Sequence, residues 1–164
     1  MSKQIPAAHA NAGFHAWRLF LQSHSQLVAG LDEALRVDAG LPLSWYDVLV
    51  HIWEAPSHTV RMRELEDRVF FSQSTVSRTI ARMEAAGLVL RKVPENNRRI
   101  LDVELTVLGL DTVQLGRQVA KSYLTANFQT VLRAGEAELL VDILGRLLAA
   151  PVQSRLGKND ARRK

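Results

Sequence analysis

The 164-residue sequence contains no cysteine, which excludes disulfide bonds, thiolate metal ligands and thiol-based redox chemistry. It also lacks any run approaching the roughly 20 apolar residues that a membrane-spanning helix needs. Its N-terminus lacks the apolar core of a signal peptide. We therefore expect a soluble, cytoplasmic protein.

The sequence also lacks the usual signs of an active site. We find no nucleophile–base arrangement, no glycine-rich phosphate loop and no paired carboxylates. The five histidines are scattered and do not form a convincing set of metal ligands; they are His9, His15, His24, His51 and His58. We therefore expect neither an enzyme nor a bound metal or cofactor.

What is present is a small basic excess, concentrated in one segment. Lysine and arginine number 21 and aspartate and glutamate 17, a net charge of +4. Residues 71–101 hold six basic residues and two acids, which is +4 within 31 residues. A focused excess of this kind is typical of a surface that binds a polyanion.

The same segment has the pattern of a helix-turn-helix followed by a β-wing. A short apolar pattern with Leu65 at its centre precedes a second helix, whose inner face carries Val76, Ile80 and Met83 and which ends at Gly87. Two strands, at residues 89–92 and 100–103, then flank a polar loop. Together these elements predict a winged helix-turn-helix that contacts duplex DNA.

The second helix is predicted to enter the major groove. We expect Ser72 to cap it and Arg78 to make a bidentate contact with guanine, while Arg82 meets a phosphate. The loop arginines could instead be solvated surface charge, but their place beside a recognition helix favours contact with DNA. The predicted DNA-binding residues are Ser72, Gln73, Ser74, Thr75, Ser77, Arg78, Arg82, Asn97, Arg98 and Arg99.

Long amphipathic helices are predicted on both sides of this core. A shorter helix, over Ser44–Glu54, should be capped by Ser44 with Asp47 as its capping-box partner. The winged core cannot cover the apolar stripes of the long helices, so we expect a twofold dimer. The predicted organisation is a flexible N-terminus at 1–12, a dimerisation helix at 13–40, the winged helix-turn-helix at 41–105, dimerisation helices at 106–150 and a basic flexible tail at 151–164. The fold class is thus mainly α with a small β-wing.

From Leu43 to Gly109 the sequence resembles the multiple-antibiotic-resistance regulator (MarR) family. The matching stretches are Ser72–Arg78, Arg82–Glu84, Gly87–Val89 and Leu105–Thr106 with Gly109. The resemblance implies a homodimer that binds a near-palindromic promoter site, usually as a repressor, and that is often released by a small aromatic or phenolic ligand.

The chain departs from the family pattern at three positions. Asn97 replaces the usual acid of the wing's Asp-x-Arg motif, and an amide cannot form the ion pair with arginine. Phe70 stands where a glycine is common, and Glu66 where an alanine is common. The loss of that ion pair puts the rigidity of the wing in question. Phe70 and Glu66 affect local packing, but neither removes the predicted DNA-facing side chains.

A ligand site is predicted where the first helix, the Ser44–Glu54 helix and the recognition helix meet. Resemblance to urate-sensing relatives suggests Trp17, Asp47 and Arg82 as ligand contacts, and His51 is a further candidate. Trp45 and Trp53 could line the same pocket. The alternative is that the tryptophans are core residues and that Asp47 only caps its helix.

A second hypothesis is a winged-helix protein-interaction module that never touches DNA. Such a module would carry apolar anchors on the outward face of its recognition helix. Here that face carries glutamine, serine, threonine and arginine, which favours the DNA-binding interpretation.

Overall fold

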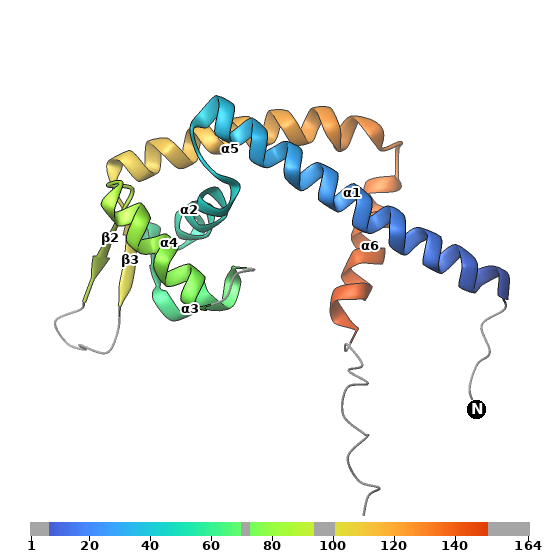
Figure 1. Ribbon diagram of the computed structural model, residues 1–164, viewed down its shortest axis with the longest axis horizontal. Helices are drawn as coiled ribbons and strands as arrows, with labels where there is room; N and C mark the ends of the chain where they lie inside the picture. Colours follow the sequence, from blue (N-terminus) through green and yellow to red (C-terminus); the bar gives the residue numbers. More distant parts are fainter. Residues whose placement is uncertain (1–6, 70–72, 94–100, 151–164) are drawn as a thin grey trace, which may run out of the picture.

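The computed structural model describes residues 7–69, 73–93 and 101–150. Two long helices, α1 (Ala7–Ala39) and α5 (Val107–Asn127), run alongside each other above a small body made by the middle of the chain (Figure 1). That body contains α2 (Leu43–Glu54), η1 (Pro56–His58), β1 (Thr59–Arg61), α3 (Met62–Arg68), α4 (Gln73–Ala85), β2 (Val89–Lys92) and β3 (Asp102–Leu105). A turn, η2 (Gln129–Val131), leads to α6 (Glu136–Ala149).

The three strands form an antiparallel sheet in the order β1-β3-β2. Val60 lies opposite Val103, and Leu105 lies opposite Val89. Strand β2 occupies the predicted residues, but β3 begins two residues later than predicted. Strand β1 was not predicted, because a three-residue strand is too short to show an alternating pattern.

The hydrophobic core lies where α2, α3 and α4 pack against this sheet. The predicted inner face of α4 is confirmed, since Val76, Ile80 and Met83 are each fully buried. They contact a cluster that includes Leu49 of α2 and Val103 of β3. Burying large apolar side chains on one stripe of α4 fixes which side of that helix faces outward.

Helix α4 ends at Ala85, and Gly87 stops it as predicted, in a Schellman motif. Gly87 has φ +74°, a conformation that side chains with a Cβ adopt at a cost. The amide of Gly87 donates to the carbonyl of Glu84, and the amide of Leu88 donates to that of Met83. These two bonds satisfy carbonyls at the helix end and turn the chain into β2.

The predicted capping box at Ser44 and Asp47 is wrong. Helix α2 begins one residue earlier, at Leu43, and Pro42 takes the N-cap position without a side-chain hydrogen bond. Instead, Asp32 of α1 accepts a hydrogen bond from the Leu43 amide at 2.7 Å. The cap is therefore supplied by a carboxylate eleven residues away in sequence, and it joins α1 to α2.

The long helices differ from the predictions at both ends. Helix α1 begins at Ala7, within the segment that we expected to be loose. Helix α5 ends at Asn127, although the apolar pattern continues to Leu132. The side chains of Asn127 and Thr130 bind the carbonyls of Tyr123 and Ala126, which competes with another helical turn.

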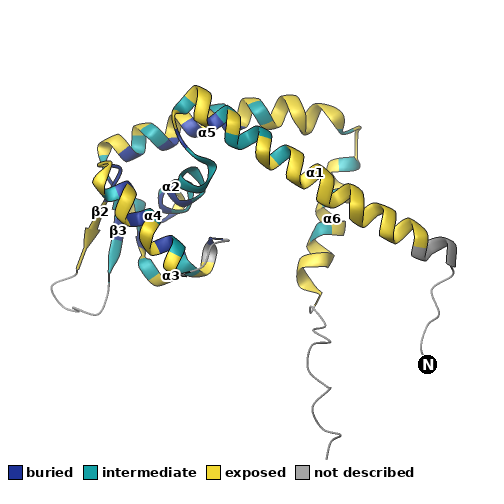
Figure 2. Cartoon of the chain, in the orientation of Figure 1, coloured by how far each residue is buried: buried dark blue, intermediate teal, exposed yellow. Residues whose placement is uncertain are grey.

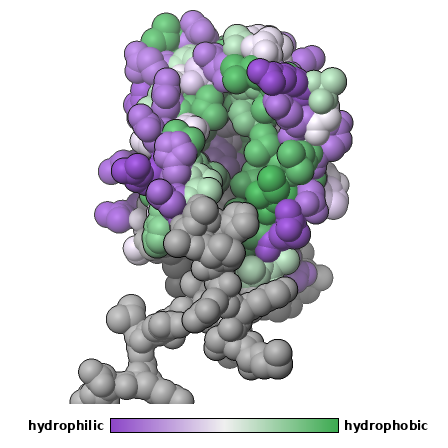
Figure 3. Space-filling view, turned by 90° about the vertical axis from the view of Figure 1, so that its right-hand side faces the viewer, coloured by the Kyte–Doolittle hydropathy of each residue, from purple (hydrophilic) through white to green (hydrophobic). Residues whose placement is uncertain are grey.

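A large apolar surface is left exposed on α6 and on the N-terminal half of α1. No residue of α6 is buried, and both segments are largely exposed in Figure 2. Exposed apolar side chains on these segments include Phe14, Trp17, Phe20, Leu21, Leu139, Val141, Leu147 and Leu148. Figure 3, which faces this side of the molecule, shows hydrophobic residues gathered between hydrophilic margins.

Candidate nucleic-acid interface

The outward side of α4 is polar and cationic along most of its length. Ser74, Ser77, Arg78 and Arg82 are exposed, and Thr75 is half-buried. All five lie opposite or beside the buried stripe of α4. The structure therefore brings the described members of the predicted recognition surface together on one helix face.

The Arg78 side chain is already bonded to its own helix. Its Nε donates to the carbonyl of Ser74, one turn earlier, at 3.2 Å. A guanidinium carries further N–H donors on its two terminal nitrogens. The bond restrains the stem of Arg78. The N–H groups on its two terminal nitrogens are suited to a pair of acceptors such as the O6 and N7 atoms of guanine.

Several predicted contacts fall outside the described part of the chain. These are Ser72, the side chain of Gln73, and the wing residues Asn97, Arg98 and Arg99. Their roles remain predictions. The basic tail at 151–164 is also outside the described residues.

The two basic residues of β2 have acidic partners. Arg91 binds Glu84 of α4, and Lys92 binds Glu104 of β3. The hydrogen bond from Arg91 lowers the pKa of the Glu84 carboxyl below its usual value. Two of the six basic residues in the 71–101 segment thus form ion pairs within the domain, and the focused charge seen in the sequence overstates the cations available to a polyanion.

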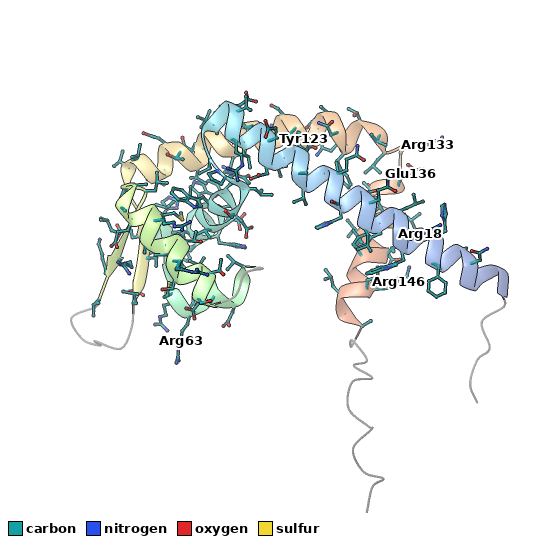
Figure 4. All side chains as sticks on the ribbon, viewed as in Figure 1. Arg18, Arg63, Tyr123, Arg133, Glu136 and Arg146 are labelled. Carbon is teal, nitrogen blue, oxygen red and sulfur yellow. The ribbon has the colours of Figure 1, made fainter. Side chains whose placement is uncertain are left out.

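Two exposed arginines that the sequence reasoning missed lie on the elements that precede α4. Arg61 ends β1 and Arg63 lies in the first turn of α3. The Arg63 side chain projects from α3 at the edge of the molecule toward which β2 and β3 extend (Figure 4). In a helix-turn-helix the first helix crosses the DNA backbone, so the Arg61-Met62-Arg63 alternation at its start was the available signal.

The predicted ligand residues are only partly brought together. On α2, Nε2 of His51 lies 3.7 Å from Oδ1 of Asp47. Burial raises the pKa of the Asp47 carboxyl, and the charge of His51 opposes that shift. Trp17 lies on the far part of α1, exposed and stacked on Phe20. From Trp17 to the end of α1 is 22 residues, or about 33 Å at the α-helical rise, so one chain does not gather Trp17 with Asp47.

The other tryptophans pack as structural residues. Trp45 and Trp53 are partly buried against the core. Arg117 of α5 lies over the Trp53 ring at 3.7 Å from its centroid, and His58 stacks on the same ring. Trp53 thus ties α5 to the winged body, which agrees with the core interpretation of these tryptophans.

An open groove of about 390 Å³ lies elsewhere, between α1 and α5. Asp38, Gln118 and Tyr123 are among its lining residues. Within residues 7–69, 73–93 and 101–150, no cluster of histidine and acidic side chains is suited to hold a metal ion. No helix in these same ranges is long and apolar enough to cross a membrane.

Comparison with known proteins shows similarity to one family. The MarR family model matches residues 39–100. AbsC, a MarR family transcriptional regulator from Streptomyces coelicolor, is 27% identical and superimposes with a TM-score of 0.78; the match covers 90% of this chain and 96% of AbsC. No curated protein sequence gives a significant match.

Two further solved structures share the fold. Sco3205, a MarR family regulator from the same organism that was solved in complex with DNA, is 24% identical with a TM-score of 0.79 and 97% of both chains covered. BpsR from Bordetella bronchiseptica, whose DNA binding is regulated by 6-hydroxynicotinic acid, is 21% identical with a TM-score of 0.71, covering 82% of this chain and 93% of BpsR. Residues 39–100 thus match the MarR family model, and the described part of the chain shares the architecture of MarR family transcriptional regulators.

Proposed function

We propose that this protein is a dimeric repressor that binds a near-palindromic promoter site and is released by a small aromatic ligand. The observation that carries the proposal is the outward face of α4, where Ser74, Ser77, Arg78 and Arg82 lie opposite a fully buried apolar stripe. Short hydrogen-bonding side chains with arginine suit the base edges and phosphates of a major groove. The DNA complex of Sco3205 has the same fold, which supports this use of it.

The exposed apolar surface of α1 and α6 supports the dimer. Side chains such as Leu147, 63% exposed, and Leu148, 89% exposed, cost free energy when they are left in water. Contiguous apolar surface of this kind usually marks a protein interface. A twofold dimer would present two α4 helices to half-sites one helical turn apart, or about 34 Å.

Repression and release by an aromatic ligand are proposed for different reasons. A dimer seated on promoter DNA excludes other proteins from it, so we propose repression. The half-buried Asp47–His51 pair offers a carboxylate and an imidazole to a small aromatic ligand. A site that contains Trp17 as well would need α1 of the second protomer. The control of BpsR by 6-hydroxynicotinic acid makes aromatic acids the first compounds to test.

The test of DNA recognition compares two arginines on one helix. Duplexes are first selected from a random pool with the wild-type protein, and affinity is then measured for the selected duplex and for a scrambled one. Arg78→Ala should remove the preference between them, since a bidentate guanine contact gives about 1–3 kcal/mol of discrimination. Arg82→Ala should weaken both by the same factor and lower the slope of log affinity against log salt by about 0.9.

The alternative, a protein-interaction module, predicts no selected sequence and no retention on DNA at low salt. The polar outward face of α4 disfavours it. Equal losses on both duplexes for Arg78→Ala would make Arg78 a phosphate contact. The predicted wing contacts Arg98 and Arg99 should likewise affect affinity more than sequence preference.

A further inference from the structure

One carboxylate on α4 holds the strand that follows the turn. The Glu84 side chain accepts hydrogen bonds from the backbone amide of Arg91 at 3.2 Å and from its Nε at 2.7 Å. Nη2 of Arg91 also pairs with the same carboxylate. Backbone and side chain of one β2 residue are thus bound to one α4 residue, seven positions earlier.

This contact bridges two elements that meet at the turn through Gly87. The Schellman bonds fix the end of α4 and the reversal of the chain, but they involve only residues up to Leu88. Glu84 makes its bonds further along β2, beyond the turn. A restraint placed away from a pivot limits rotation of the strand about that pivot more strongly than one placed at it.

The orientation of β2 relative to α4 is important because β2 leads into the wing segment. A winged helix-turn-helix places a recognition helix and a β-hairpin on the same duplex. If β2 turns relative to α4, the two cannot both reach their contacts. A charge-assisted contact of this kind has defined geometry, although its exposed position limits its strength.

We propose that Glu84 is a positioning residue, which holds β2 at a fixed orientation to α4 and thereby sets how well this protein discriminates between DNA sequences. Arg91 is its partner and not a DNA contact. The inference rests on the proposed DNA-binding function and extends it to a residue that does not touch DNA.

Charge alone and the positioning role predict different effects of removing Glu84 on the affinity for DNA. Glu84 is an acid beside a surface that is proposed to meet a polyanion. Removing it adds one unit of positive charge and frees a guanidinium, which should strengthen binding to every sequence. The positioning role predicts instead that binding to the preferred sequence falls while binding to other sequences rises.

The chain provides a matched control for this comparison. Lys92 and Glu104 form a second ion pair of similar exposure, but it connects β2 to β3 within the sheet. Glu84→Met and Glu104→Met remove the same charge and the same acceptor atoms, and methionine is tolerated in helices and strands alike. Only Glu84→Met removes the ion pair and the hydrogen bonds between α4 and Arg91 of β2.

The experiment measures the affinity ratio between the selected duplex and its scrambled counterpart. Glu104→Met should raise both affinities equally and leave the ratio unchanged. Glu84→Met should lower the ratio about fivefold to tenfold, the size expected for losing a partly exposed charge-assisted contact. An equal ratio in the two variants would overturn the inference. A Glu84→Met protein that unfolds and loses affinity for both duplexes would also overturn it, because Glu84 would then stabilise the fold rather than position β2.

A charge exchange tests the pair directly. The double variant Glu84→Arg with Arg91→Glu should restore most of the lost ratio, because it rebuilds an ion pair between α4 and β2. A ratio that stays low would show that Arg91 itself binds DNA, and would overturn the positioning role. A wild-type protein that selects no sequence would instead overturn the proposed function, and with it this inference.

Discussion

At the junction between the winged body and α5, we predict that replacing Gly109 by alanine destabilises the protein. A Cβ built on Gly109 would lie 2.0 Å from the carbonyl oxygen of Leu88. Ordinary contact begins at 3.4 Å, so Gly109→Ala requires a shift of 3.4 − 2.0 = 1.4 Å at the start of α5. The overlapping atoms of Leu88 belong to the backbone, so no side-chain rotation relieves the overlap.

That shift would disturb the hydrogen bonds that anchor α5. The Thr106 hydroxyl donates to the carbonyl of Gly87 at 2.7 Å, and the Thr106 amide donates to that of Leu88 at 3.1 Å. The same hydroxyl accepts from the Gly109 amide as the N-cap of α5. Overpacking costs about 1–3 kcal/mol, each weakened hydrogen bond about 1 kcal/mol, and alanine returns about 1 kcal/mol of helix propensity. We expect a net loss of about 2–4 kcal/mol.

Urea unfolding followed by circular dichroism, at one protein concentration, measures this loss. Gly145→Ala is the control, since a Cβ there meets nothing within 4 Å. It should stabilise the protein by about 0.5–1 kcal/mol through helix propensity. If Gly109→Ala proved as stable as the wild type, the close approach of α5 to Leu88 would be refuted.

Three further predictions follow from buried, capping and exposed positions. Met83→Ala should lower the free energy of unfolding by about 2–4 kcal/mol, because its side chain is fully buried; a loss below 1 kcal/mol in urea unfolding would contradict that packing. Asp32→Ala should destabilise the protein at pH 7. Hydrogen bonds from Arg36 and from the Leu43 amide lower the pKa of Asp32, so its contribution is complete above its unfolded pKa of about 3.9 and is lost as the pH falls through the lowered folded value. The stability difference from wild type should narrow toward pH 3, and a pH-independent difference would exclude this linkage. Leu147→Asp should convert the proposed dimer to a monomer in analytical ultracentrifugation, and an unchanged sedimentation coefficient would place the dimer interface elsewhere.

The winged core could be predicted because its signals are local. The spacing of Val76, Ile80 and Met83 gives the buried face of α4, and Gly87 gives its end. Once that face is assigned, the outward position of Arg78 and Arg82 follows from helix geometry. The exposed, polar side of α4 could therefore be predicted from the sequence.

The errors come from interactions between distant residues. The local pattern at Ser44 fits a capping box, but Asp32 reaches the Leu43 amide from another helix. A count of basic residues cannot show that Arg91 and Lys92 have acidic partners, because those pairs form only when the strands assemble. The end of α5 likewise depends on which side chain binds which carbonyl.

The bond from Arg78 to the carbonyl of Ser74 has a kinetic consequence. A free arginine side chain loses about 2 kcal/mol of rotamer entropy when it is immobilised, and here part of that loss occurs during folding of α4 itself. If Arg78 reads bases as proposed, an encounter with a wrong base sequence then gains little from adjusting the side chain, because its stem is already restrained through Nε. Incorrect complexes should consequently dissociate quickly, and the protein can sample many positions along a duplex before it stops.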